Sequence, residues 1–211
     1  MVDIAVVDYG MGNLRSVHNA LIAVAPNASI VVTDDPSVVA QAKRVVFPGQ
    51  GAMPDCMREL DARNLRNAVI DAARNRPFLG ICIGLQMLFE HSTEGDVSCL
   101  GILPGQVVRF PHELRDANGA KLKVPHMGWN EVHHEEHEMW QGIAQDARFY
   151  FVHSYYVQPS DASLVQAVSH YPQPFVCAVA RKNLFAVQFH PEKSHQTGLQ
   201  LLRNFVNWNP V

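Results

Sequence analysis

Cysteine is scarce in this sequence of 211 residues. The chain has four cysteines, Cys56, Cys82, Cys99 and Cys177, and no two of them form a Cys-x-x-Cys pair. This spacing argues against a disulfide scaffold and a zinc ribbon. The simplest interpretation is a cytoplasmic protein with reduced thiols.

The chain also lacks an excess of positive charge and long hydrophobic runs. Its formal net charge is −3, and no apolar stretch reaches the length that crosses a membrane. The first residues, Met1 to Asp8, lack the basic start and small-residue cleavage site of a signal peptide. We therefore expect neither a nucleic-acid partner nor a membrane partner.

What is present is the composition of a globular protein, 47% hydrophobic and 18% charged. The length fits a single domain over residues 1–211. In the first half, short apolar segments alternate with stretches whose apolar residues recur at helical spacing. These stretches include Leu14, Val38 and Leu60, and the one that begins at Leu60 is expected to form one longer helix to Ala72. This alternation predicts a parallel sheet with helices on both faces and strand ends at one edge. The expected strands are Ile4–Val7, Ser29–Val32, Arg44–Phe47 and Phe78–Ile81.

The second half changes character, because short alternating segments are separated by Pro, Gly and Asn turns. That pattern predicts an added antiparallel portion. Leu184–Phe189 indicates a return to the core, and a last helix is expected over 198–206. The expected fold class is α/β with a mostly parallel central sheet. The expected antiparallel strands are Val107–Phe110, Leu122–Val124, Arg148–Val157, Leu164–Ser169 and Phe175–Ala180.

The segment from Gly80 to Gly84 is the strongest chemical signal. A buried strand turns into helical periodicity at Cys82, and Gly-x-Cys-x-Gly is the thiol form of a nucleophile elbow. Glycines on either side suit a strained turn, and a helix N-terminus would favour thiolate. The alternative is a buried structural cysteine.

A base for such a thiol is available in His190-Pro191-Glu192. His190 follows the last expected strand and should reach the same sheet edge, while Glu192 points the same way in extended backbone. A carboxylate bound to one imidazole nitrogen leaves the other facing Cys82. The alternative is a surface turn without a role.

Acyl chemistry also needs donors for an oxyanion. The Ile83 amide and the loop Gly49-Gln50-Gly51 are candidates, although the loop could be a plain tight turn. Gln86 lies one helical turn after Cys82 and could bind a polar substrate or simply face solvent.

Together these residues resemble the class I (triad) glutamine amidotransferases. Flanking motifs narrow the resemblance to the glutaminase subunits of histidine biosynthesis, and the match runs nearly end to end. These motifs are Tyr9-Gly10-Met11-Gly12-Asn13-Leu14-Arg15-Ser16-Val17, Pro125-His126-Met127-Gly128-Trp129-Asn130, Tyr150-Phe151-Val152-His153-Ser154-Tyr155 and Phe189-His190-Pro191-Glu192-Lys193-Ser194.

The resemblance implies that Cys82 attacks the side chain of L-glutamine, with His190 as base and Glu192 as its orienting group. It implies that Gln86, His153, Ser154 and Tyr155 hold the glutamine. No cofactor is implied. Gln50 departs from the aliphatic residue that is frequent in the family, which leaves backbone donation intact but changes the loop's neighbours.

The resemblance further implies that ammonia passes to a separate cyclase subunit, a (β/α)₈ barrel, and that the isolated chain is a poor glutaminase. It places Asn13, Arg15, Met127, Trp129 and Lys193 toward this heterodimer partner. Met and Trp in a Gly/Pro-flanked loop suit an interface, but core packing explains them equally well from sequence alone, and Lys193 could be a solvated lysine.

Several features are given no catalytic role. The histidines and glutamates between His126 and Glu138 match no zinc spacing and are interpreted as a solvated loop without metal. Cys56, Cys99 and Cys177 are interpreted as structural. Competing functions are the glutaminase of another amidotransferase, a non-catalytic protein with an elbow cysteine, and, more weakly, a cysteine peptidase.

Overall fold

The parallel half of the sheet is formed as the sequence predicts. The computed structural model describes residues 2–111, 113–116 and 118–210, and within them one mixed 13-stranded sheet runs through the molecule. Its parallel strands lie in the order β2-β1-β3-β4-β13. Their bounds are β1 Ile4–Val7, β2 Ile30–Thr33, β3 Arg44–Gly49, β4 Phe78–Cys82 and β13 Leu184–Val187.

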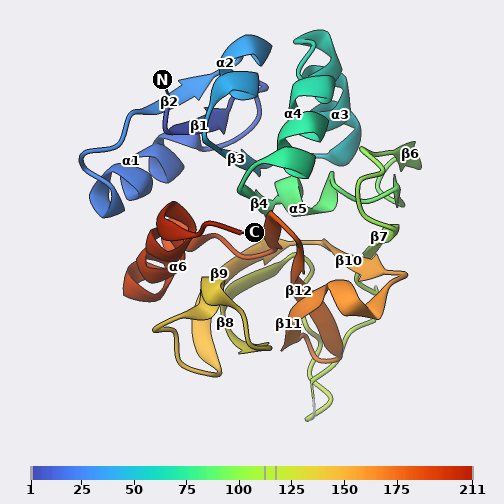
Figure 1. Cartoon of the computed structure of the whole chain (residues 1–211). Helices are drawn as coiled ribbons and strands as arrows, with labels where there is room; N and C mark the ends of the chain where they lie inside the picture. The colour runs from blue at the N-terminus through green and yellow to red at the C-terminus, as the bar shows by residue number, and fades with distance from the viewer. Residues whose placement is uncertain (1, 112, 117, 211) are drawn as a thin grey trace.

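Helices cover both faces of this parallel sheet, because alternate strand residues point to opposite sides. Ala5 and Val7 pack in the core under one helix layer, and Ile4 and Val6 pack under the other. In Figure 1 α1 and α6 lie on one side of the sheet, and α3 and α4 lie on the other. The helices are α1 Leu14–Val24, α2 Pro36–Gln41, α3 Met53–Ala62, α4 Arg66–Asn75 and α6 His195–Asn207.

The second half adds the expected antiparallel portion, which begins where β12 pairs antiparallel with β13. The α/β class with a mostly parallel sheet and an antiparallel extension is therefore confirmed. The remaining strands are β5 His91–Ser92, β6 Val97–Ser98, β7 Gly105–Arg109, β8 His126–His134, β9 Ala147–His153, β10 Tyr155–Pro159, β11 Val165–His170 and β12 Pro174–Arg181. Short turns of helix are α5 Ile83–Gln86, η1 Glu138–Trp140, η2 Ala162–Leu164 and η3 Pro191–Lys193.

The prediction of one longer helix from Leu60 to Ala72 is wrong. The apolar stripe belongs to two helices, α3 and α4, that are separated at Asn64. Asn64 has φ +58°, a left-handed conformation that asparagine tolerates better than most residues. The stripe continues across the break because both helices cover the same core.

Three expectations in the second half also need correction. Residues 122–124 form no strand. Residues 148–157 form two strands, β9 and β10, which are separated at Ser154. The stretch expected as a loop with many histidines is mostly strand β8, which pairs with β9 over residues 126–132 and with β11 at His133 and His134. No helix in the described part of the chain is long and apolar enough to cross a membrane.

Candidate active site

Cys82 stands at a strained corner between β4 and α5. Its φ of +56° and ψ of −112° are unfavourable for a residue with a side chain, and such strain is typical of functional turns. Glycine is required next to it, because a Cβ atom on Gly84 would overlap the carbonyl oxygen of Phe47. A Cβ atom on Gly80 would press against Ala186. The Gly-x-Cys-x-Gly pattern therefore reflects how closely β3 and β13 approach the elbow.

The helix behind the elbow is much shorter than its apolar periodicity suggests. α5 ends at Gln86, and the chain continues in tight turns in which the Leu88 N–H donates to the Leu85 carbonyl. A four-residue helix has too few aligned peptides for a substantial dipole. Stabilisation of a Cys82 thiolate therefore depends on its side-chain neighbours.

His190 and Glu192 form a buried pair beside the elbow. His190 follows β13, the parallel neighbour of β4, and its Nδ1 lies 2.8 Å from Oε1 of Glu192. The Glu192 side chain is only 3% exposed. In the described residues the other ring nitrogen, Nε2, is buried and has no hydrogen-bond partner. His190 and Cys82 line the same cavity, so the imidazole lies on the same cavity wall as the thiol while Glu192 holds its Nδ1.

Charge around His190 favours its protonated form. Burial alone lowers the pKa of His190, but the negative charge at Cys82 and the Glu192 carboxylate bound to Nδ1 together raise it to about 10. The imidazole is thus suited to carry a proton beside the cysteine, as the histidine of other cysteine–histidine sites does.

The cavity at the elbow has a volume of about 350 Å³. It brings together most of the expected site residues from distant parts of the sequence. Gly49 lies next to it, opposite Cys82 in the pairing of β3 with β4, and a Cβ atom there would overlap the Tyr9 hydroxyl. The expected residues that line the cavity are Gln50, Gly51, Cys82, Ile83, Gln86, His153, Ser154, Tyr155, His190 and Lys193.

The loop after β3 meets α3 through the Gln50 carbonyl, which accepts a hydrogen bond from the Cys56 thiol at 3.7 Å. Cys56 is buried, and burial raises the pKa of its thiol to about 12. Cys56 is therefore neutral at physiological pH and has the character of a structural cysteine. The loop glycine, Gly51, has φ +117°, which few other residues adopt.

His153 belongs to a buried chain of hydrogen bonds that the sequence did not reveal. Its Nδ1 lies 2.8 Å from the Tyr155 carbonyl, and its Nε2 lies 3.1 Å from Nδ1 of His126. His126 is stacked between Phe151 and Tyr171. The carbonyl requires an N–H from His153, so His153 Nε2 accepts and His126 donates. The only sequence signal was that both histidines stand in motifs already noted.

This histidine pair should make stability depend on pH. Burial lowers the pKa of His126 to about 4 and that of His153 to about 3. The unfolded chain binds these protons near pH 6.5, so stability is complete above that pH and falls below it. Between pH 6.5 and 5 we expect the free energy of unfolding to drop by roughly 1 kcal/mol per pH unit for each histidine. Urea unfolding at pH 7 and pH 5 measures this.

The His126→Phe variant is the control, because it keeps an aromatic ring between Phe151 and Tyr171 and removes one titrating group. Its unfolding free energy should change less steeply with pH. Equal stability of the wild-type chain at pH 7 and pH 5 would contradict the expectation.

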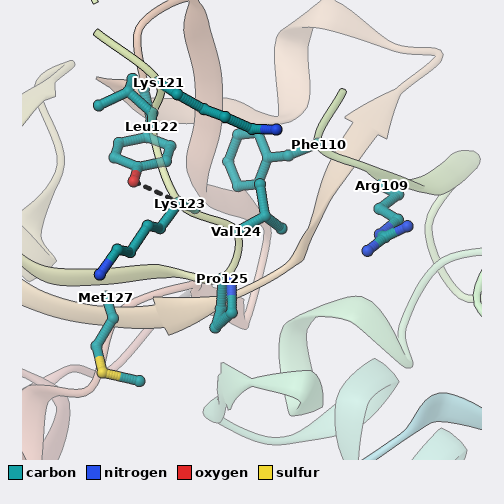
Figure 2. Close-up of a pocket in the computed structure, with 9 residues that line it drawn as sticks. Arg109, Phe110, Lys121, Leu122, Lys123, Val124, Pro125 and Met127 are labelled. Atoms are coloured by element: carbon teal, nitrogen blue, oxygen red, sulfur yellow. Dashed lines mark hydrogen bonds between the residues drawn. The ribbon is translucent and has the colours of Figure 1, made fainter. Parts of the chain in front are cut away.

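A larger hollow of about 950 Å³ adjoins the active-site cavity, and Pro125 lines both. Figure 2 shows Lys121 and Lys123 on one side of this hollow, Arg109 on the other and Met127 at its lower end. The Tyr171 hydroxyl donates to the Lys123 carbonyl at 2.7 Å. The hollow therefore joins the active-site mouth to the strand that carries Met127.

Most of the residues expected at a partner interface are exposed, namely Asn13, Arg15, Met127 and Trp129. Met127 is 62% exposed and Trp129 is 38% exposed, so neither is a core residue. They stand two apart on β8 and share one face. Trp129 also stacks on His195 at 5.0 Å. Asn13 caps α1 by accepting from the Ser16 N–H, and Arg15 is exposed on the first turn of that helix.

Each of the histidines at 133, 134 and 137 contacts a different partner. His133 lies 3.0 Å from Asp146, His134 stacks on Trp140, and His137 packs on Phe185. Within the described ranges, no group of three or more His, Cys, Asp or Glu side chains is arranged to hold a metal ion.

Comparison with known proteins agrees with this geometry. A family model described as glutamine amidotransferase class-I matches residues 5–208, and the chain belongs to that family. The fold is similar to that of a crystal structure of a glutamine amidotransferase, with a TM-score of 0.71, 16% identity and coverage of 96% of this chain and 97% of the other.

Within the family, the chain belongs with the proteins called imidazole glycerol phosphate synthase subunit HisH. It is 67% identical to that subunit of Thiobacillus denitrificans, over 99% of this chain and 92% of the relative. It is 66% identical to that of Nitrosospira multiformis, over the full length of both.

Proposed function

We propose that this chain is the glutaminase subunit of imidazole glycerol phosphate synthase in histidine biosynthesis. It hydrolyses L-glutamine to glutamate and ammonia and passes the ammonia to a cyclase subunit. The observation that carries the proposal is the elbow cysteine beside the buried His190–Glu192 pair, in a chain 67% identical to a HisH subunit.

In the proposed first half-reaction, the Cys82 thiolate attacks the side-chain amide carbon of glutamine. A carbon–sulfur bond forms, and the oxyanion is held by backbone N–H groups of Ile83 and the loop from Gly49 to Gly51. His190 gives its proton to the nitrogen, the carbon–nitrogen bond breaks, and ammonia leaves. A glutamyl thioester on Cys82 remains.

In the second half-reaction, His190 is neutral and takes a proton from water. The resulting hydroxide attacks the thioester carbon, the carbon–sulfur bond breaks, and glutamate and thiolate are released. Glu192 keeps the imidazole in the orientation that both steps need. Gln86, His153, Ser154 and Tyr155 surround the substrate.

The proposed docking face for the cyclase consists of Asn13, Arg15, Met127, Trp129 and Lys193. The exposed Met127 and Trp129 supply apolar anchors of a kind enriched at interfaces. Lys193 directly follows Glu192 and lines the cavity, so it lies at the boundary between this face and the reacting groups.

The test is glutamine hydrolysis by the purified chain alone, with the cyclase subunit, and with the cyclase and its nucleotide substrate. We expect little hydrolysis by the chain alone and full activity only in the loaded complex. A Met127→Ala/Trp129→Ala chain should need a higher concentration of cyclase. Equal activity in all three wild-type mixtures would contradict the coupling, and no hydrolysis in any would contradict the proposed activity.

A further inference from the structure

The buried side chain of Gln188 lies directly behind the nucleophile. Gln188 is fully buried and follows β13, where its backbone N–H donates to the Cys177 carbonyl at 2.8 Å. Its side-chain Nε2 donates to Cys82 Sγ at 3.7 Å, and its Oε1 accepts from Gln86 Nε2 at 2.9 Å. One buried amide therefore links the nucleophile to a residue that lines the substrate cavity.

We propose that Gln188 is a positioning residue for the glutaminase reaction. It stabilises the Cys82 thiolate by donating an N–H to sulfur, and it fixes the direction in which Gln86 faces the substrate. This inference rests on the proposed function and adds a residue to its machinery.

The available donors and acceptors fix the orientation of the side-chain amides of Gln86 and Gln188. Gln86 Nε2 donates to the Tyr155 carbonyl at 2.9 Å and to Gln188 Oε1, so both of its hydrogens are used. If the Gln86 amide were flipped, its oxygen would face two acceptors. Gln86 is therefore held with Oε1 as the acceptor that remains for an N–H group of glutamine.

The orientation of the Gln188 amide follows from its partners in the same way. Its oxygen is occupied by Gln86, so its N–H₂ group is the part that faces sulfur. Buried amides that lack a partner are costly, and here the oxygen and the nitrogen each have one. The Tyr155 carbonyl also accepts from His153, which anchors the far end of the chain.

Gln188 is a neutral donor among charged and titratable neighbours of the thiol. Removing its N–H should change the ionisation of Cys82 without removing any of those charges. The titratable groups around Cys82 come from every side of the site: His190 with Glu192 behind it, Glu94, His153, Tyr155 and Lys193 on the cavity wall, and Tyr9 and Cys56 on the side of the core.

Two nearly isosteric variants separate the two contacts. Gln188→Glu keeps an oxygen for Gln86 and removes the N–H toward sulfur, whereas Gln188→Met removes both. The readouts, on the complex with the cyclase, are the pH profile of Cys82 alkylation by iodoacetamide, followed by peptide mass spectrometry, and the KM and kcat for glutamine.

We expect the alkylation midpoint to rise by about one pH unit in both variants. KM should rise about tenfold in Gln188→Met and much less in Gln188→Glu, because only the former leaves Gln86 without its acceptor. Gln86→Met serves as the matched control. It should raise KM but leave the alkylation midpoint at the wild-type value.

A wild-type midpoint in both folded Gln188 variants overturns the inference. Failure of both variants to fold also overturns it, because the contribution of Gln188 would then be structural. These outcomes differ from failure of the proposed function, in which the wild-type complex would not hydrolyse glutamine while the alkylation profile could still report the contact between Gln188 and sulfur.

Discussion

Replacing Cys82 by alanine is expected to reduce glutamine-dependent synthesis by the complex on the order of 10⁴- to 10⁶-fold. Covalent catalysis cannot begin without the sulfur, and a neighbouring histidine alone gives only weak hydrolysis. Synthesis from added ammonia should continue at the wild-type rate, because ammonia needs no glutaminase. The measurement compares product formation from glutamine and from ammonium salts with the same Cys82→Ala complex.

Cys99→Ala is the matched control for this substitution. Cys99 is another buried cysteine, with its pKa raised by burial to about 11, and it lies outside the elbow cavity. Its replacement should leave both activities near the wild-type values. Sustained turnover of glutamine by Cys82→Ala would show that another group is the nucleophile.

The second large effect is expected for Glu192→Gln. The carboxylate accepts the Nδ1 hydrogen of His190 at 2.8 Å, which leaves Nε2 available for proton transfer, and its charge stabilises the imidazolium. An amide of the same shape removes the charge and can favour the wrong tautomer. We expect kcat for glutamine to fall by about 10²- to 10⁴-fold with a modest change in KM. Steady-state kinetics of the complex measure both constants.

Glu131→Gln provides the comparison, because Glu131 is an exposed glutamate on β8. It should retain wild-type kinetics. A protein that uses the elbow cysteine without acid–base catalysis has no need of Glu192. Wild-type turnover in Glu192→Gln would therefore favour that alternative.

The parallel half of the fold and the convergence of the triad residues could be anticipated because both depend on short-range patterns. Alternating strand and helix periods fix a parallel sheet, and parallel strands end at one edge. Cys82 is the last residue of β4 and His190 comes shortly after β13, so their proximity follows from topology once β4 and β13 are neighbours. Local glycines mark the turn itself.

Other features depend on contacts that no local pattern encodes. The break at Asn64 lies within an apolar stripe that both helices share. β8 is a strand although its many His and Glu residues are typical of a solvated loop, because its pairing with β9 determines its conformation. His126 and Gln188 acquire their roles from partners 27 and 106 residues away. Such tertiary hydrogen bonds appear only in the folded chain.

The most direct test of Cys82 as the nucleophile is covalent labelling of the complex by a glutamine analogue that carries an electrophilic ketone in place of the side-chain amide. Peptide mass spectrometry then locates the modified residue. We predict one label per chain, on Cys82, with glutamine-dependent synthesis lost in step with labelling and ammonia-dependent synthesis retained. Labelling of another residue in step with the loss, or full glutamine-dependent activity with Cys82 modified, would contradict it.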